Sequence, residues 1–131
     1  MARILIIEDD PDLSDLMAVT LRPAGHDVLT AGDGAEGLCA LGTFAPDLLV
    51  IDIMLPDIVG LSLCERVRST SLPGERRIPI LITSACDERD AGPLATAAGA
   101  DAFLPKPFSP YQLLLRLHAL LGRPAEKTLA G

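Results

Sequence analysis

The sequence has no tryptophan, and aromatic residues make up only 3% of the chain. No apolar run approaches the roughly 20 residues that a membrane-spanning helix needs. Met1-Ala2-Arg3 leads directly into a short strand-like run rather than into a signal peptide. The three cysteines (Cys39, Cys64 and Cys86) are odd in number, lie far apart and form no CxxC pair. These absences favour a reduced, cytoplasmic protein with no membrane contact.

Basic residues are also in short supply. Eleven Lys and Arg stand against eighteen Asp and Glu, so the net charge is −7 and the pI is near 4.6. This balance argues against direct binding of nucleic acid, which needs a basic face. Hydrophobic residues make up 49% and charged residues 22% of the chain, which is typical of a globular protein. We expect one domain over residues 1–122, with residues 123–131 as a tail or the start of a linker.

Short apolar runs recur along the chain, and segments with helical spacing lie between them. The strong runs cover residues 4–7, 48–51, 78–82 and 102–104, and a weaker run covers 28–30. Because the strong runs are continuous rather than alternating, they are typical of strands buried on both faces of a parallel sheet. Leucine stripes after each of several runs predict helices. The pattern predicts an α/β fold, a (βα)5 domain with helices on both faces of a five-stranded parallel sheet.

Capping residues mark the starts of two helices, and a third helix is predicted to be short. Asp10-Pro11 places an acceptor before a first-turn proline, and residues 109–112 form a capping box. Gly92-Pro93 falls where the first turn of the fourth helix is expected. We therefore expect that helix to begin near Pro93 and to stop before Gly99. Residues 86–92 would then be a mobile loop.

Polar residues stand where four of the strands are expected to end. Glu8, Asp9 and Asp10 follow the first strand, and the others are Asp52, Ser84 and Lys106. The carboxyl ends of parallel strands meet at one edge of a sheet, so these groups are expected to converge there. Helix capping explains Asp10. Taken singly, Ser84 is equally well explained as an ordinary strand-end hydroxyl, and Lys106 is better explained as a solvated surface lysine. The joint pattern is what indicates a site.

This set of groups has a chemical logic. Clustered carboxylates repel one another unless a cation relieves them, and oxygen ligands of this kind suit Mg²⁺. A carboxylate held beside Mg²⁺ can attack phosphorus and form an aspartyl phosphate. Lys106 and Ser84 would then hold the phosphoryl oxygens, one as a point charge and the other as a hydroxyl donor.

Three stretches carry a specific resemblance to a known family. They are residues 4–11 (ILIIEDDP), 50–57 (VIDIMLPD) and 99–108 (GADAFLPKPF). Through them, the chain from about Arg3 to Leu121 resembles the receiver domain of two-component response regulators. The resemblance implies a doubly wound, flavodoxin-like sheet with strand order 2-1-3-4-5. It also implies that Asp52 accepts a phosphoryl group from the phosphohistidine of a partner, either a sensor histidine kinase or a phosphotransfer protein.

The resemblance implies a downstream partner as well. The output is either a separate protein, with this chain as a stand-alone adaptor, or an output domain of a longer regulator. A phosphorylation-dependent homodimer is left open. The domain would assist its own phosphotransfer and dephosphorylation, and it would not be an enzyme acting on other substrates.

Metal and switch residues follow from the same resemblance. It implies that Asp9, Asp52 and the Met54 backbone carbonyl hold Mg²⁺, with Glu8 helping through water. Lys106 and Ser84 match the family's phosphoryl-binding residues. The Ser84 hydroxyl and Phe103 match its two switch positions: the aromatic side chain turns inward when the hydroxyl moves onto the phosphoryl group. The Lys106-Pro107 bond is cis in the family.

Several positions depart from the usual family pattern. Glu8 replaces the more usual Asp and is one methylene longer, which changes the water-mediated side of the metal site. Phe103 lacks a hydroxyl, so burying it gains packing but no hydrogen bond. Met54 and Cys86 match the variable positions that flank the phosphoryl group, and neither is suited to orient water, so we expect slow self-dephosphorylation. Val59 stands where the family often has Asp. The fourth helix contributes to the family's output face, so the Gly92-Pro93 loop either changes that face or is simply tolerated there.

Other functions fit the residues less well. Residues 32–37 match GxGxxG, but they follow the second strand and include two acids, so a glycine turn explains them better than a dinucleotide site. A Mg²⁺-dependent phosphatase is disfavoured because one domain has no second domain to close over a substrate. A flavodoxin-like electron carrier is disfavoured because the acids would repel a flavin phosphate. His26 and His118 are isolated in the sequence and are expected to be solvated.

Overall fold

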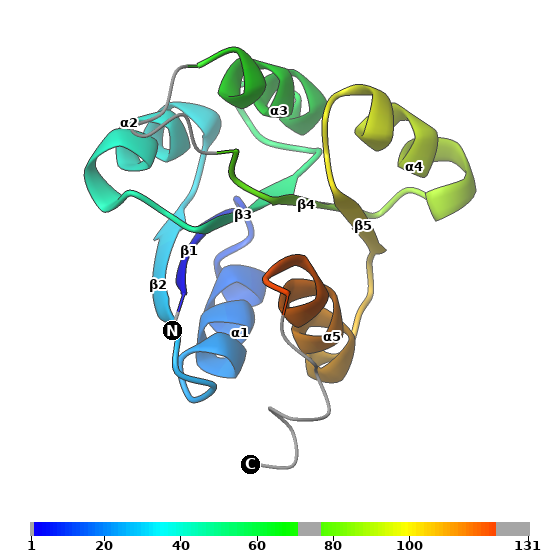
Figure 1. Ribbon diagram of the computed structural model, residues 1–131. Helices are drawn as coiled ribbons and strands as arrows, with labels where there is room; N and C mark the ends of the chain where they lie inside the picture. Colours follow the sequence, from blue (N-terminus) through cyan, green and yellow to red (C-terminus); the bar gives the residue numbers. More distant parts are fainter. Residues whose placement is uncertain (1, 71–76, 123–131) are drawn as a thin grey trace.

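The computed structural model describes residues 2–70 and 77–122, where strands and helices alternate (Figure 1). The predicted tail at 123–131 lies outside the described residues. The strands are β1 (Arg3–Ile7), β2 (Asp27–Ala31), β3 (Leu48–Asp52), β4 (Ile80–Ser84) and β5 (Ala102–Pro105). The helices are α1 (Pro11–Leu21), α2 (Gly34–Phe44), α3 (Gly60–Ser69), α4 (Glu88–Ala97) and α5 (Pro110–Leu120).

The strands form one parallel sheet in the order β2-β1-β3-β4-β5, which confirms the predicted fold and strand order. The central strands β3 and β4 are buried at every residue, as their continuous apolar sequences indicate. β2 lies at one edge of the sheet and is exposed or half-buried along most of its length. Its edge position explains why its apolar run is weak.

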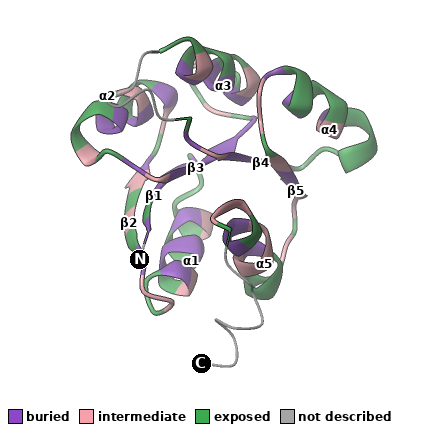
Figure 2. Cartoon of the chain, viewed as in Figure 1, coloured by how far each residue is buried: buried purple, intermediate pink, exposed green. Residues whose placement is uncertain are grey.

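Helices cover both faces of the sheet. α1 and α5 lie on one face, and α2, α3 and α4 lie on the other (Figure 1). Because side chains alternate across a strand, the neighbours Leu5 and Ile6 enter two different apolar clusters, one on each face. Figure 2 shows the buried sheet between helices whose outer surfaces are exposed. Among the described residues, no helix has the length and apolar character needed to cross a membrane.

The predicted helix starts at α1 and α5 are confirmed. The side chain of Asp10 accepts hydrogen bonds from the backbone N–H groups of Asp12 and Leu13, at 3.0 and 3.4 Å. At α5, the Gln112 N–H donates to Ser109 Oγ at 3.1 Å, and the Ser109 N–H donates to Gln112 Oε1 at 2.8 Å. These bonds satisfy N–H groups that have no partner inside their own helices.

The prediction for α4 is wrong at the start of the helix. α4 begins at Glu88 rather than near Pro93, so most of the loop expected at 86–92 is helical. The Asp87 side chain accepts a hydrogen bond from the Arg89 N–H at 3.3 Å, and acids in the first turn suit the positive end of the helix dipole. Pro93 lies inside the helix, where it cannot donate to the Arg89 carbonyl. The cap at Asp87 and the small buried residues Ala91 and Ala95 offset that loss.

The expected end of α4 is confirmed. The helix stops at Ala97, and Gly99 follows with a φ of 103°. This left-handed conformation is open to glycine at little cost. A Cβ at Gly99 would also lie 2.9 Å from the side chain of Arg68, so glycine is needed here for space as well.

The two histidines are buried, in contrast to the solvated state expected for them. Their Nε2 atoms lie 3.1 Å apart, and the Nδ1 atom of His26 accepts a hydrogen bond from the Ala2 N–H at 3.2 Å. The pair joins the residue before β2 to the last turn of α5. Because 92 positions separate His26 from His118, no local pattern could have revealed the pairing.

Replacing Pro93 by alanine is expected to stabilise the domain. Alanine supplies an N–H for the Arg89 carbonyl and is preferred over proline in a helix interior by about 3 kcal/mol. The unfolded chain of the alanine variant has more conformational freedom, which offsets part of this gain and leaves a net increase of about 1–2 kcal/mol in the free energy of unfolding. Urea unfolding measures the difference. Leu94→Ala, at the exposed next position, is the control and should stay within about 0.5 kcal/mol of the wild type. A Pro93→Ala protein no more stable than this control would contradict the account.

Candidate functional site

The residues at the carboxyl edge of the sheet are held by the strand ladder itself. Hydrogen bonding continues past the ends of the strands, because the Glu8 N–H donates to the Ala31 carbonyl at 3.0 Å and the Lys106 N–H donates to the Ser84 carbonyl at 2.7 Å. The side chains of Glu8 and Lys106 therefore start from backbone that the sheet positions. Their convergence follows from the parallel topology.

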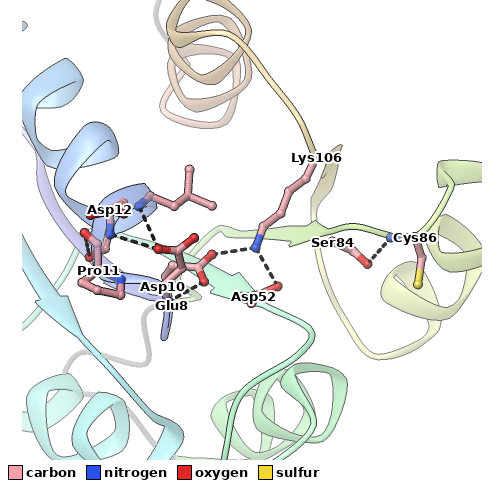
Figure 3. Close-up of polar contacts among 10 residues, drawn as sticks. Glu8, Asp10, Pro11, Asp12, Asp52, Ser84, Cys86 and Lys106 are labelled. Carbon is pink, nitrogen blue, oxygen red and sulfur yellow. Dashed lines mark hydrogen bonds and ion pairs between the residues drawn. The ribbon is translucent and has the colours of Figure 1, made fainter.

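The ammonium group of Lys106 lies between two buried carboxylates (Figure 3). Its Nζ atom is 2.9 Å from Glu8 Oε1 and 3.3 Å from Asp52 Oδ1. Glu8 and Asp52 are each only 3% exposed. Buried carboxylates are costly unless a cation compensates them. Lys106 supplies that charge, and it reaches both acids from a third strand end.

Burial raises the pKa of Glu8 above its ordinary value. Hydrogen bonds from Lys106 Nζ and from the Asp10 N–H, the latter 3.1 Å from Oε2, act against this rise. The negative charge of Asp52 adds to it. For Lys106, burial acts to lower the pKa, but the hydrogen bond to Glu8 and the charge of Asp52 outweigh burial and raise it. The ammonium therefore keeps its proton at neutral pH.

Three carboxylates form a cluster that could hold a metal ion. Glu8, Asp9 and Asp52 each offer an oxygen, and these oxygens lie within 4.8 Å of one another. Asp9 is exposed, whereas the other two are buried, so the cluster opens to solvent on one side. Hard oxygen donors of this kind suit Mg²⁺. Met54, the other residue expected to hold the metal, lies in the loop after β3, and its side chain is 68% exposed.

Ser84 is buried at the end of β4, and its hydroxyl faces its own loop. Its Oγ atom accepts a hydrogen bond from the Cys86 N–H at 2.9 Å (Figure 3). An oxygen that accepts in this way still has its own proton to donate. Thr83 is the residue that pairs with Asp52 in the sheet. Thr83 and Ser84 point to opposite faces of the strand, as alternation requires.

Phe103 lies in the apolar cluster on the side of α2, α3 and α4. Its residue is 6% exposed, so the ring is already buried in this structure. Its backbone carbonyl accepts a hydrogen bond from the guanidinium group of Arg116 on α5. Phe103, Pro93 and Arg116 line a cleft of about 450 Å³ between α4 and α5. The Lys106-Pro107 peptide bond is cis, as the resemblance implied.

The structure thus brings Glu8, Asp9, Asp52 and Lys106 to one place and puts Ser84 at the end of the next strand. Asp57 had no predicted role, but its carboxylate accepts hydrogen bonds from the N–H groups of the first two residues of α2. The available signal was the position of Asp57, two residues before Val59. The family often has an acid at the position that Val59 occupies. A local pattern could not show which helix that acid would reach.

Comparison with known proteins identifies the family. The profile of the response regulator receiver domain matches residues 4–118. The chain belongs to that family. Its members are signalling regulators of two-component systems rather than a class of enzymes.

Named relatives agree with this assignment. The receiver is 40% identical to the DNA-binding dual master transcriptional regulator RpaA of Synechocystis, over 94% of this chain and 50% of that protein. It is 38% identical to the alkaline phosphatase synthesis transcriptional regulatory protein PhoP of Bacillus subtilis, over 92% of this chain and 49% of that protein. The chain therefore spans about half the length of these relatives.

A solved structure supports the fold at the level of the domain. The receiver domain of the Francisella response regulator 1452 superposes with a TM-score of 0.84 at 30% identity. The match covers 93% of this chain and 98% of that one. The present receiver therefore has the fold of a family member along nearly its whole length.

Replacing Glu8 by glutamine is expected to raise the melting temperature at pH 7 by about 3–6 °C, which is roughly 1 kcal/mol in a domain of this size. The folded state raises the pKa of Glu8, so it favours the protonated carboxyl. The stability from that neutral form is complete below the ordinary value of 4.5 and is lost as the pH rises through the folded-state pKa. The gain from glutamine should therefore shrink as the pH is lowered toward 4.5.

Thermal unfolding across this pH range tests the account. Asp10→Asn is the control, because it removes a neighbouring but exposed charge and keeps a side chain that can cap α1. It should leave the melting temperature nearly unchanged. A Glu8→Gln protein that melts below the wild type at pH 7 would show that the ion pair with Lys106 outweighs the cost of burial.

Proposed function

We propose that Asp52 is the residue on which this receiver accepts a phosphoryl group. The observation that carries the proposal is the position of the Lys106 ammonium, 3.3 Å from Asp52 Oδ1 and 2.9 Å from Glu8 Oε1. It places a fixed positive charge where a transferred phosphoryl group would need one. Asp52 meets the remaining requirement, because it is a carboxylate within an acidic cluster that opens to solvent at Asp9.

In the proposed reaction, a carboxylate oxygen of Asp52 attacks the phosphorus of a phosphohistidine on a partner protein. The new O–P bond forms as the P–N bond breaks, and the electron pair of the broken bond stays on the imidazole nitrogen. Lys106 donates hydrogen bonds to the phosphoryl oxygens and offsets their charge. A small acyl phosphate can replace the phosphohistidine, with its acyl carboxylate as the leaving group. The receiver's own residues thus assist the transfer.

The residues present fit the divalent ion that the family uses. Asp9, Asp52 and the backbone carbonyl of Met54 would hold Mg²⁺, and Glu8 would help through water. When bound, Mg²⁺ neutralises charge on the phosphoryl oxygens. Asp9 is the exposed member of the cluster and is therefore the first ligand that an entering ion would meet.

The proposed response to phosphorylation begins at Ser84. Its hydroxyl has a proton available, so it would leave the Cys86 N–H and donate to the phosphoryl group. The change would pass to Phe103 and to the surface formed by α4, β5 and α5. A local change in charge and hydrogen bonding would thus bias a second conformation of the domain.

The proposed partners come from both ends of a signalling pathway. A sensor histidine kinase or a phosphotransfer protein would supply the phosphoryl group in the cytoplasm. The output would be a fused domain, as the greater length of RpaA and PhoP suggests by analogy, or a separate protein. The unit that receives the signal would be residues 1–122 in either case.

Incubation with Mg²⁺ and acetyl phosphate should give a single phosphoryl adduct that intact-mass spectrometry detects. Asp52→Asn should abolish the adduct, because the amide oxygen is a poor nucleophile. Asp9→Asn is the matched control: it removes a carboxylate from the same cluster, so it should slow the reaction and still allow an adduct. An adduct on the Asp52→Asn protein, or none on folded wild type with Mg²⁺ bound, would refute the proposal.

The phosphoryl group is expected to be lost slowly. The residues at 54 and 86 are methionine and cysteine. Neither side chain has a group well suited to orienting an attacking water. Met54→Asn or Cys86→Lys should shorten the phosphoryl lifetime by at least about threefold, a small part of the 10²–10⁴-fold that positioned proton-transfer groups supply. Phosphorylated protein is followed by mass after the phosphodonor is removed. Val19→Asn, on the exposed side of α1, should leave the lifetime as it is. A phosphoryl lifetime that stays unchanged in the Met54→Asn and Cys86→Lys proteins would contradict the prediction.

A further inference from the structure

Asp57 ties the loop after β3 to a helix from a different α/β unit. Its Oδ1 atom accepts a hydrogen bond from the Gly34 N–H at 2.8 Å, and its Oδ2 atom accepts one from the Ala35 N–H at 2.9 Å. These are the first two N–H groups of α2, which have no acceptor inside their own helix. The two bonds lower the pKa of Asp57, so its carboxylate is charged at neutral pH and complements the helix dipole.

The helix that follows the loop receives no such bond. α3 begins after Val59, whose side chain makes no capping hydrogen bond. The loop therefore has an acid that could serve a helix start, and that acid serves α2, more than twenty positions back in the sequence. Capping of the adjacent helix does not explain Asp57. A link between the loop and α2 does.

The loop between β3 and α3 is held at two places. At its base, the Gly60 N–H donates to the Ile53 carbonyl at 2.6 Å, and Met54 and Val59 form an antiparallel bridge. A Cβ at Gly60 would lie 2.1 Å from the Asp52 carbonyl oxygen, so the base closes tightly on the end of β3. The exposed side chain of Met54 has little packing of its own to hold it.

At its tip, the loop rests on the first turn of α2. A Cβ at Gly34 would lie 2.3 Å from Ile58 Cγ2, so the tip approaches the helix as closely as glycine permits. Asp57 and Ile58 therefore dock together, one through its carboxylate and the other through its side chain. This contact gives the first glycine of α2 a structural purpose that needs no phosphate ligand.

We propose that Asp57 is a positioning residue for the metal site. The inference rests on the proposed function, in which the Met54 carbonyl is a Mg²⁺ ligand. By clamping the tip of the loop to α2, Asp57 keeps the loop from pivoting about its base and so holds the Met54 backbone in one orientation. Without the clamp, that carbonyl is spread over more orientations and Mg²⁺ binds more weakly.

The chain offers a matched control at the same helix end. Asp33 is the N-cap of α2, and its carboxylate accepts a hydrogen bond from the Glu36 N–H at 2.8 Å. Asp33→Ala and Asp57→Ala each remove one negative charge and one capping carboxylate from the start of α2. Only Asp57→Ala also releases the loop. A difference between these variants therefore reports the clamp rather than helix capping or net charge.

Isothermal titration calorimetry of Mg²⁺ without phosphodonor provides the first measurement. Asp57→Ala should raise the Mg²⁺ dissociation constant by about threefold to tenfold, at or below the low end of the roughly 10–100-fold that loss of outer-shell support costs at metal sites. Asp33→Ala leaves the loop clamp in place, so its Mg²⁺ dissociation constant should stay within about twofold of the wild-type value, well below that range. Asp57→Asn, which keeps one good acceptor, should fall between them. Amide hydrogen exchange gives a second readout: the Gly60 N–H should exchange faster in Asp57→Ala than in Asp33→Ala.

Each outcome decides the proposal. Equal Mg²⁺ affinities in the Asp57→Ala and Asp33→Ala proteins, with equal exchange at Gly60, would reduce Asp57 to a helix cap. If Asp57→Ala does not fold, the Asp57→Asn comparison with Asp33→Ala decides in its place. Absence of a phosphoryl adduct on the wild type would refute the proposed function and leave this affinity comparison valid. A wild-type protein that binds no Mg²⁺ would overturn the positioning role as well.

Discussion

The charge of Lys106 is what allows two carboxylates to be buried at one edge of the sheet. Glu8 and Lys106 are 98 positions apart in the sequence, and Asp52 comes from a third strand. Their contact therefore exists only when β1, β3 and β5 have taken their places in the sheet. The same arrangement leaves Glu8 at an energetic cost, because burial opposes its charge more strongly than Lys106 and the loop stabilise it. The receiver thus keeps a local instability where the proposed chemistry needs a concentrated negative charge.

The fold and most of this site could be predicted because both depend on the parallel sheet. Continuous apolar runs indicate strands buried on both faces, and the residue after each run lies at the edge where parallel strands end. The sequence therefore predicts that three side chains converge, without any known contact between them: those of Glu8, Asp52 and Lys106. Helix starts at Asp10 and Ser109 could be predicted for a similar reason. A cap is a local hydrogen bond between residues that the sequence already places side by side.

The features that could not be predicted depend on competition between local signals or on contacts between residues far apart in the sequence. At α4, Gly92-Pro93 favours a late helix start, but the cap at Asp87 favours an early one, and the helix begins at Glu88. His26 and His118 meet across 92 positions, and neither has a neighbour in sequence that marks it. Asp57 belongs to the same class. Its acidity is visible in the sequence, but the helix it reaches is set by how closely the loop packs on Gly34.

The two proposed switch residues differ in what they can contribute. Ser84 has a hydroxyl proton to offer, so its movement can be driven by a hydrogen bond to a phosphoryl group. Phe103 is already buried and has no hydroxyl to exchange between surface and interior. The cleft beside its ring is walled partly by Pro93, where α4 lacks one internal hydrogen bond. Under the proposed function, the change at Ser84 would therefore reach α4 through the packing of Phe103 against that helix, with no hydrogen bond gained by the aromatic side chain.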